Sequence, residues 1–111
     1  MSDRRPADLV ADLLDLAHEL EGYVTSWSEA EFLADRAKQR VVERTLELLG
    51  EVATRLGEEA PDVDVDWKAL RDLRIMLGPL HADHRIDPRR LWAHAARDVP
   101  HLREAVEAWA G

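Results

Sequence analysis

The chain has 111 residues, enough for one domain with a modest core, and 46% of them are hydrophobic, which excludes a disordered tail. It contains no cysteine, so disulfide frameworks, thiolate nucleophiles and Cys-containing zinc sites are excluded. Its net charge of −8 at pH 7 is opposite in sign to that of an ordinary nucleic-acid-binding domain.

The N-terminal stretch MSDRRPADLV has no apolar signal core. No segment approaches the ~20 consecutive apolar residues that a membrane span requires. We therefore expect a cytoplasmic protein without a membrane partner, folded as a single domain over residues 1–111.

The first predicted helix begins near Pro6, because proline is favoured in the first turn of a helix, and it ends between Tyr23 and Trp27. Leucines at three- and four-residue steps mark its buried face: Leu9, Leu13, Leu16 and Leu20. Ser28 and Glu31 then have the spacing of a capping box.

The capping box opens a long predicted helix, with room for a kink, that Gly57 and Pro61 stop. Its apolar stripe consists of Phe32, Leu33, Val41, Val42, Leu46, Leu49, Val52 and Leu56. A polar linker over 61–65 follows, after which Asp64 or Asp66 caps a third helix.

That third helix carries Trp67, Leu70, Leu73 and Leu77. Gly78-Pro79 should break or kink it, because proline lacks an N–H and crowds the preceding turn. Residues 81–85 are then predicted to form a loop or a frayed turn.

Asp87-Pro88 predicts a helix start, with a capping carboxylate before a first-turn proline. Asp98-Val99-Pro100 repeats this pattern and predicts a separate last helix that reaches Trp109. No segment alternates like a strand. The sequence thus predicts an all-α fold, a four- to five-helix antiparallel bundle.

Charge is unevenly distributed along the chain. Residues 67–97 hold seven positive and three negative side chains, a local charge of +4 that leaves −12 for the rest. The positive residues are Lys68, Arg71, Arg74, Arg85, Arg89, Arg90 and Arg97. An anionic ligand belongs at this segment, although solvated helix faces would give the same pattern.

Arg74 and His81 are the first candidates for chemistry in this segment. A histidine exchanges protons near neutral pH, and an arginine holds phosphate and neutralises developing charge, so the pair suits metal-free RNA cleavage. Two alternatives stay open: a metal site formed by His81, Asp83 and His84, and a polar loop without chemistry.

His18, His94 and His101 are predicted to be structural, since His94 and His101 show no acidic companion at a suggestive spacing. Trp67, Trp92 and Trp109 are predicted to be core anchors.

Several segments, taken in order, resemble the HepT-like family of HEPN-domain ribonuclease toxins. They are Phe32-Leu33-Ala34-Asp35; the block from Arg44 to Glu51; Trp67, seven residues before Arg74; Ile86-Asp87; Trp92; and Asp98-Val99-Pro100. The series covers almost the whole chain.

The resemblance implies an all-helical homodimer that cleaves RNA without metal or cofactor, and a minimal nucleotidyltransferase antitoxin as its partner. Arg74 and His81, with six residues between them, fit the family's Arg–His motif. Supporting or substrate-binding roles fall to Asp83, His84, Arg71, Arg85, Arg89 and Arg90.

The sequence departs from the family at three positions. Ile75 replaces the usual polar residue after the arginine, the spacer contains Gly78-Pro79, and Asp83 occupies the position of the tyrosine that receives AMP from the partner. The leading hypothesis, which rests on Arg74, His81 and the local basic segment, is an endoribonuclease toxin of a toxin–antitoxin pair. The alternative is a catalytically degenerate, dimeric binding module that contacts a nucleotidyltransferase.

Overall fold

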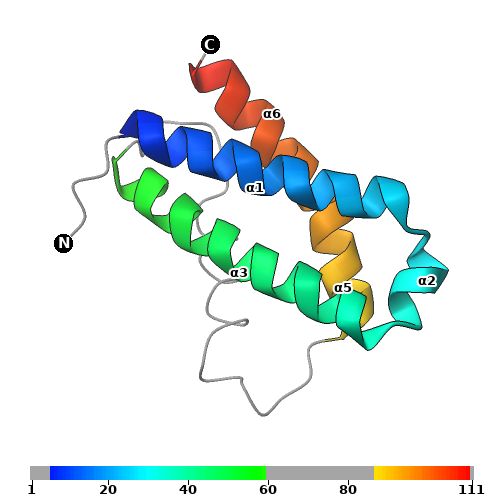
Figure 1. The fold of residues 1–111 in the computed structure, drawn as a ribbon. Helices are drawn as coiled ribbons and strands as arrows, with labels where there is room; N and C mark the ends of the chain where they lie inside the picture. The colour runs from blue at the N-terminus through cyan, green and yellow to red at the C-terminus, as the bar shows by residue number, and fades with distance from the viewer. Residues whose placement is uncertain (1–5, 60–86, 111) are drawn as a thin grey trace.

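The structure, a computed structural model, describes residues 6–59 and 87–110, and every described segment of regular structure in it is helical. The helices are α1 (Pro6–Ser26), α2 (Glu29–Leu33), α3 (Arg36–Glu59), α5 (Pro88–Ala93), the π-helical turn η2 (His94–Asp98) and α6 (Val99–Ala110). Figure 1 shows α1 and α3 running in opposite directions side by side, with α5 and α6 crossing behind them. The predicted all-α bundle is confirmed.

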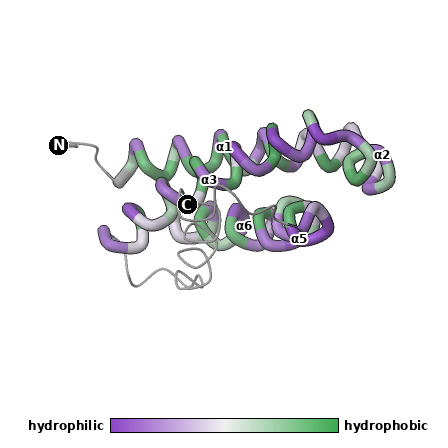
Figure 2. The backbone as a smooth tube through the Cα atoms, turned by 90° about the horizontal axis from the view of Figure 1, so that it is seen from below, coloured by the Kyte–Doolittle hydropathy of each residue, from purple (hydrophilic) through white to green (hydrophobic). Residues whose placement is uncertain are grey.

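The core lies between α1, α3 and the run of helix formed by α5, η2 and α6. Leucines of α1 and the apolar stripe of α3 supply two sides of the core. The third side comes from the run of α5, η2 and α6, which lies in a second layer beneath α1 and α3 (Figure 2). The side chains with no exposed surface include Leu13, Leu20, Phe32, Val42, Leu46, Leu49, Leu56 and Val106. Each buried leucine contributes about 1.5–3 kcal/mol of transfer free energy, so this cluster holds the helices together.

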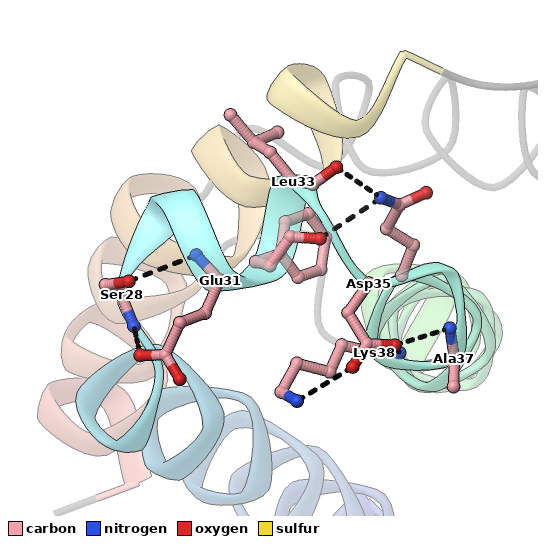
Figure 3. A network of polar contacts seen from close by, with 8 residues as sticks. Ser28, Glu31, Leu33, Asp35, Ala37 and Lys38 are labelled. Carbon is pink, nitrogen blue, oxygen red and sulfur yellow. Dashed lines mark hydrogen bonds and ion pairs between the residues drawn. The ribbon is translucent and has the colours of Figure 1, made fainter.

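The predicted boundaries of α1 and the predicted capping box are confirmed. The backbone N–H of Glu31 donates to the Ser28 hydroxyl at 3.1 Å, and the backbone N–H of Ser28 donates to the Glu31 carboxylate at 3.0 Å (Figure 3). Two of the otherwise unpaired amides at this helix start are thus satisfied.

The predicted long helix after the capping box is divided in two. It breaks at Ala34-Asp35, where Asp35 accepts hydrogen bonds from the backbone N–H groups of Ala37 and Lys38 and so begins α3 anew (Figure 3). The prediction that Gly57 ends this helix is wrong. Gly57 is buried within α3, which continues to Glu59. Pro61, the other predicted stop, and the predicted helix carrying Trp67 lie outside the described residues.

The start of α5 is confirmed, and so is a last helix over Val99–Ala110, but the predicted break and cap before that helix are wrong. Asp87 caps α5 by accepting from the backbone N–H of Arg89 at 3.0 Å, with Pro88 in the first turn. Asp98, by contrast, caps nothing, since the helix runs on through Val99 and Pro100. It widens into a π-turn in which the Val99 N–H donates to the His94 carbonyl. The wider turn accommodates Pro100, whose ring would crowd the carbonyl four residues earlier in a regular α-helix.

The predicted tryptophan anchors divide between core and surface. Trp92 packs against the core, as predicted. Trp109 is 40% exposed, so the prediction that it anchors the core is wrong. It lies near the C-terminal end of α6. Trp67 lies outside the described residues.

Candidate functional site

The predicted catalytic residues belong to the stretch between α3 and α5. Arg74 and His81 lie outside the described residues, as do four of the supporting residues: Arg71, Asp83, His84 and Arg85. The remaining two, Arg89 and Arg90, lie in the first turns of α5 and are exposed. Arg89 and Arg90 are therefore the predicted site residues that the described part of the chain contains.

The described residues on either side of 60–86 lie at opposite ends of α3. Helix α3 has 24 residues and so spans roughly 36 Å at 1.5 Å per residue. The chain leaves it at Glu59 and returns at Asp87, where α5 begins beside the start of α3 (Figure 1). Arg74 and His81 thus belong to a connection whose ends the bundle holds apart.

Packing against α2 and α3 holds α5 in place at this return point. The rings of Phe32 on α2 and Trp92 on α5 lie 5.2 Å apart between centroids, and Leu91 is buried. Arg89 and Arg90 are exposed and form no ion pair within the described part of the chain. Both guanidinium groups are therefore available to an anion close to the point where the chain returns from His81.

A histidine–carboxylate pair occupies the π-turn. The Nδ1 atom of His94 lies 2.6 Å from an Oδ2 oxygen of Asp98, and the His94 side chain is 25% exposed. The prediction that His94 lacks an acidic companion is wrong. The four-residue spacing was visible in the sequence, but Asp98 was interpreted as a helix cap. A carboxylate fixes the orientation of the imidazole and favours a proton on Nδ1.

The other two predicted structural histidines lie on the surface. The His18 side chain is 60% exposed, and its Nε2 atom lies 4.0 Å from a Glu107 carboxylate oxygen. His101 on α6 is exposed. Neither arrangement contains a nucleophile or a second histidine, so neither forms a reaction centre within the described residues.

The polar network between α1, α2 and α3 serves the backbone. Gln39 donates to the carbonyl groups of Phe32 and Leu33, both at 3.1 Å, and Lys38 pairs with Asp35 at 2.9 Å (Figure 3). Hydrogen bonds from Lys38 lower the pKa of Asp35, and those from Ser28 lower the pKa of Glu31. Both carboxylates are thereby held in the charged form that caps a helix.

Tyr23, the only tyrosine, is similarly engaged. Its hydroxyl donates to Glu19 at 2.6 Å, which raises the pKa of the phenol, and its ring stacks on Trp27 at 4.9 Å. The Thr45 hydroxyl donates to the Val41 carbonyl of its own helix at 2.7 Å and lies 3.3 Å from the same Glu19 carboxylate, which brings α3 and α1 together at this point. This group of residues fastens helices to one another.

Within residues 6–59 and 87–110, no three histidine, aspartate or glutamate side chains gather as metal ligands would. The alternative metal site of His81, Asp83 and His84 lies outside these ranges. Among the described helices, none combines the length and apolarity needed to cross a membrane.

The fold and the surface arginines together define the class of protein: over the described residues it is an all-α bundle with exposed arginines in the first turns of α5 that form no ion pair there. The chain belongs to the HepT-like ribonuclease family, since the family model "Ribonuclease HepT-like" matches residues 13–109. The resemblance predicted from the ordered segments is thereby confirmed.

Two similar proteins support this assignment across nearly their whole length. One, from Thermococcus cleftensis, is named "Probable ribonuclease HepT" and is 26% identical over 106 residues, 94% of each chain. The other, from Methanocaldococcus jannaschii, is named "Putative RNase MJ1380" and is 28% identical over 109 residues, 96% of this chain and 98% of its own. No solved structure matches the chain.

Proposed function

We propose that this protein is a metal-independent endoribonuclease, the toxin of a toxin–antitoxin pair. The observation that carries the proposal is the family match over residues 13–109, which includes Arg74 and His81 in the order and spacing of the Arg–His motif. The two similar proteins named as ribonucleases support it.

The proposed reaction uses the RNA's own 2′-hydroxyl as nucleophile. His81 acts as the general base that removes its proton, or as the general acid that protonates the departing 5′-oxygen. Arg74 binds the scissile phosphate and stabilises the crowded, doubly charged phosphorane. The products carry a 2′,3′-cyclic phosphate and a 5′-hydroxyl. DNA is inert, because it lacks the nucleophile.

The proposed partners follow from the family resemblance. A homodimer brings two copies of His81 together, so that one serves as base and the other as acid. A minimal nucleotidyltransferase serves as antitoxin, and Arg85, Arg89 and Arg90 hold phosphates that flank the cleavage site. RNA as substrate places the protein in the cytoplasm.

A second candidate is a degenerate module that binds its partner without cleaving RNA. The residues that favour it are Ile75 and the Gly78-Pro79 spacer, which depart from the family pattern around the motif.

The deciding experiment incubates purified protein with RNA and with DNA of the same sequence in the presence of EDTA. Wild type should cut only the RNA, and His81→Ala should not. His101→Ala, which removes an exposed histidine of α6, is the matched control and should cut normally. A wild type that cuts no RNA and arrests no growth when expressed without its partner would establish the degenerate module instead.

A further inference from the structure

Four arginines gather at the end of the molecule where α3 and α5 begin. Arg36 and Arg40 lie in the first turns of α3, and Arg89 and Arg90 lie in the first turns of α5. All four are exposed, and none forms an ion pair within the described residues. Among the other described cations, Lys38 pairs with Asp35, Arg44 with Glu47, and Arg103 with Glu21 and Glu107, whereas Arg55 and Arg97, on other parts of the bundle, form no ion pair there.

Packing holds the two helix starts at this same end. Helix α5 contacts both α2 and α3, and Trp92 lies against Phe32. Gln39, which lies between the two arginines of α3 in sequence, donates to the Phe32 carbonyl. The first turns of α3 and α5 therefore belong to one rigid corner of the bundle (Figure 1).

These arginines do not serve the stability of α3. The N-terminal end of a helix carries partial positive charge, so carboxylates are favoured there and cations are not. The first turn of α1 contains Asp8 and that of α2 contains Glu29 and Glu31, whereas the first turn of α3 contains no acidic residue. Although the chain as a whole is acidic, Arg36 and Arg40 lie at the N-terminal end of α3, where their positive charges oppose the helix dipole.

No carboxylate close in sequence pairs with these arginines within the described residues, and this includes Glu43, three residues after Arg40 on α3. Asp35 precedes α3 and Asp87 precedes α5, and each accepts a hydrogen bond from the backbone amides of the helix that it caps. Asp35 is further engaged by Lys38. Four guanidinium groups, each able to contact phosphate with two parallel hydrogen bonds, remain on one corner.

We propose that Arg36 and Arg40 join Arg89 and Arg90 in a single phosphate-binding face, which holds single-stranded RNA on the flank of the cleavage site. The identity of the polyanion as RNA rests on the proposed function. The role of α3 in it is new, because the basic segment recognised in the sequence begins only at residue 67. RNA fits this face because phosphates repeat along its backbone and meet spaced guanidinium groups.

The test measures binding without cleavage. Labelled oligouridine is titrated against His81→Ala protein at several salt concentrations, with or without the added pair Arg36→Ala and Arg40→Ala. Each lost phosphate contact should reduce the slope of log affinity against log salt by about 0.7, so the pair should reduce it by about 1.4. Affinity at low salt should fall about tenfold or more.

Arg55→Ala is the matched control, because Arg55 is an exposed arginine nearer the other end of α3 without a described ion pair, and it should leave binding unchanged. The midpoint of thermal unfolding of the double variant should equal or exceed that of its parent, since the removed charges oppose the helix dipole. Arg36→Gln with Arg40→Gln, which keeps polar side chains, should repeat the loss of binding.

Unchanged RNA affinity and unchanged salt slope in both double variants would refute the proposed phosphate-binding face. A parent protein that binds no RNA would refute it as well. The proposed function is judged separately, by cleavage with wild-type protein. Binding that depends on Arg36 and Arg40 in a protein that never cleaves would support the face and reject the nuclease.

Discussion

Phe32 and Trp92 bring α2 and α5 into contact across 60 residues of sequence, with ring centroids 5.2 Å apart and planes inclined by 43°. Phe32 has no exposed surface, and Trp92 packs on the core beside it. This contact determines where the chain returns from the stretch that contains Arg74 and His81. The two aromatic rings therefore connect the stability of the bundle to the position of the proposed RNA-binding corner.

We expect Phe32→Ala to lower the free energy of unfolding by about 3–5 kcal/mol, because it leaves a cavity between α2, α3 and α5. A domain of this size is stable by only about 5–15 kcal/mol, so much of its stability would be lost. Urea denaturation followed by circular dichroism measures the change. Phe32→Leu, which keeps an apolar side chain in the same space, should lose less. Equal losses in both variants would show that the contact depends on the aromatic ring and not on the apolar volume, and would contradict the cavity as the cause of the loss.

The capping box predicts a smaller and pH-dependent effect. Ser28→Ala should cost about 1 kcal/mol, because the Glu31 amide loses its acceptor. Ser26→Ala, at the end of α1, changes the same residue type without removing a cap and should cost little. Urea denaturation at neutral pH compares the two variants, and similar costs would argue against the capping role.

The sign of the pH dependence follows from the carboxylates. The pKa of Asp35 is lower in the folded protein than in the unfolded chain, because the side chain of Lys38 and then its backbone N–H donate to the carboxylate. The pKa of Glu31 is also lower, because its carboxylate accepts a hydrogen bond from the backbone N–H of Ser28. Their contribution is complete above the unfolded pKa values and is lost as pH falls through the folded ones. The stability difference between wild type and Glu31→Gln should therefore shrink as pH falls below about 4. A difference that persists in acid would contradict this.

Pro6 and the spacing of the leucines were sufficient to predict α1. Local capping signals were sufficient to predict the starts of α2 and α5. Their side chains act on amides two or three residues away, so spacing in the sequence reports the structure directly. Asp35 uses the same mechanism, but it lies within an apolar stripe that continues on both sides. The helix break it causes was therefore hidden.

The continuation from α5 into α6 could not be predicted from local signals. Asp98-Val99-Pro100 has the pattern of a new helix start, yet the side chains of Ala95, Val99 and Leu102 are buried in one core. Burial of this face stabilises one continuous helix, and the π-turn absorbs the conflict with Pro100. In the candidate site, only Arg89 and Arg90 could be compared with the structure. The arginines of α3 were missed because they are far from the basic segment in sequence.

The oligomeric state is open to direct measurement. We expect light scattering at micromolar concentration to give twice the chain mass of 12.6 kDa. Val41 is 41% exposed and Trp109 is 40% exposed, and apolar side chains of this kind are commonly shared across a two-fold interface. A clean mass of 12.6 kDa would remove the dimer and, with it, the division of acid and base between two copies of His81.

Neutralisation by a nucleotidyltransferase should not proceed through AMP transfer to residue 83. Asp83 offers a carboxylate in place of a phenol, and the hydroxyl of Tyr23, the only tyrosine, is held by Glu19. We expect the partner to inhibit by binding and occlusion, or to modify another residue. Intact-mass measurement after co-expression, followed by peptide mapping, decides the matter. Added AMP mapped to Asp83 would refute the expectation.

The last prediction concerns Arg74 and His81 as a unit. Loss of proton transfer in His81→Ala should slow RNA cleavage about 10²–10⁴-fold. Loss of charge stabilisation in Arg74→Ala should slow it about 10²–10³-fold. Because both side chains would serve one transition state, the double variant should be little slower than the slower single variant.

Single-turnover cleavage rates of the four proteins measure this coupling, once circular dichroism has shown that each is folded. Arg74→Lys is the informative control, because it keeps the positive charge but loses the paired donors that hold a phosphate in a defined orientation. It should remain well below wild type if orientation matters as much as charge. Effects that multiply in the double variant would mean that the two residues act in separate steps, and Arg74 would then be assigned to RNA binding alone.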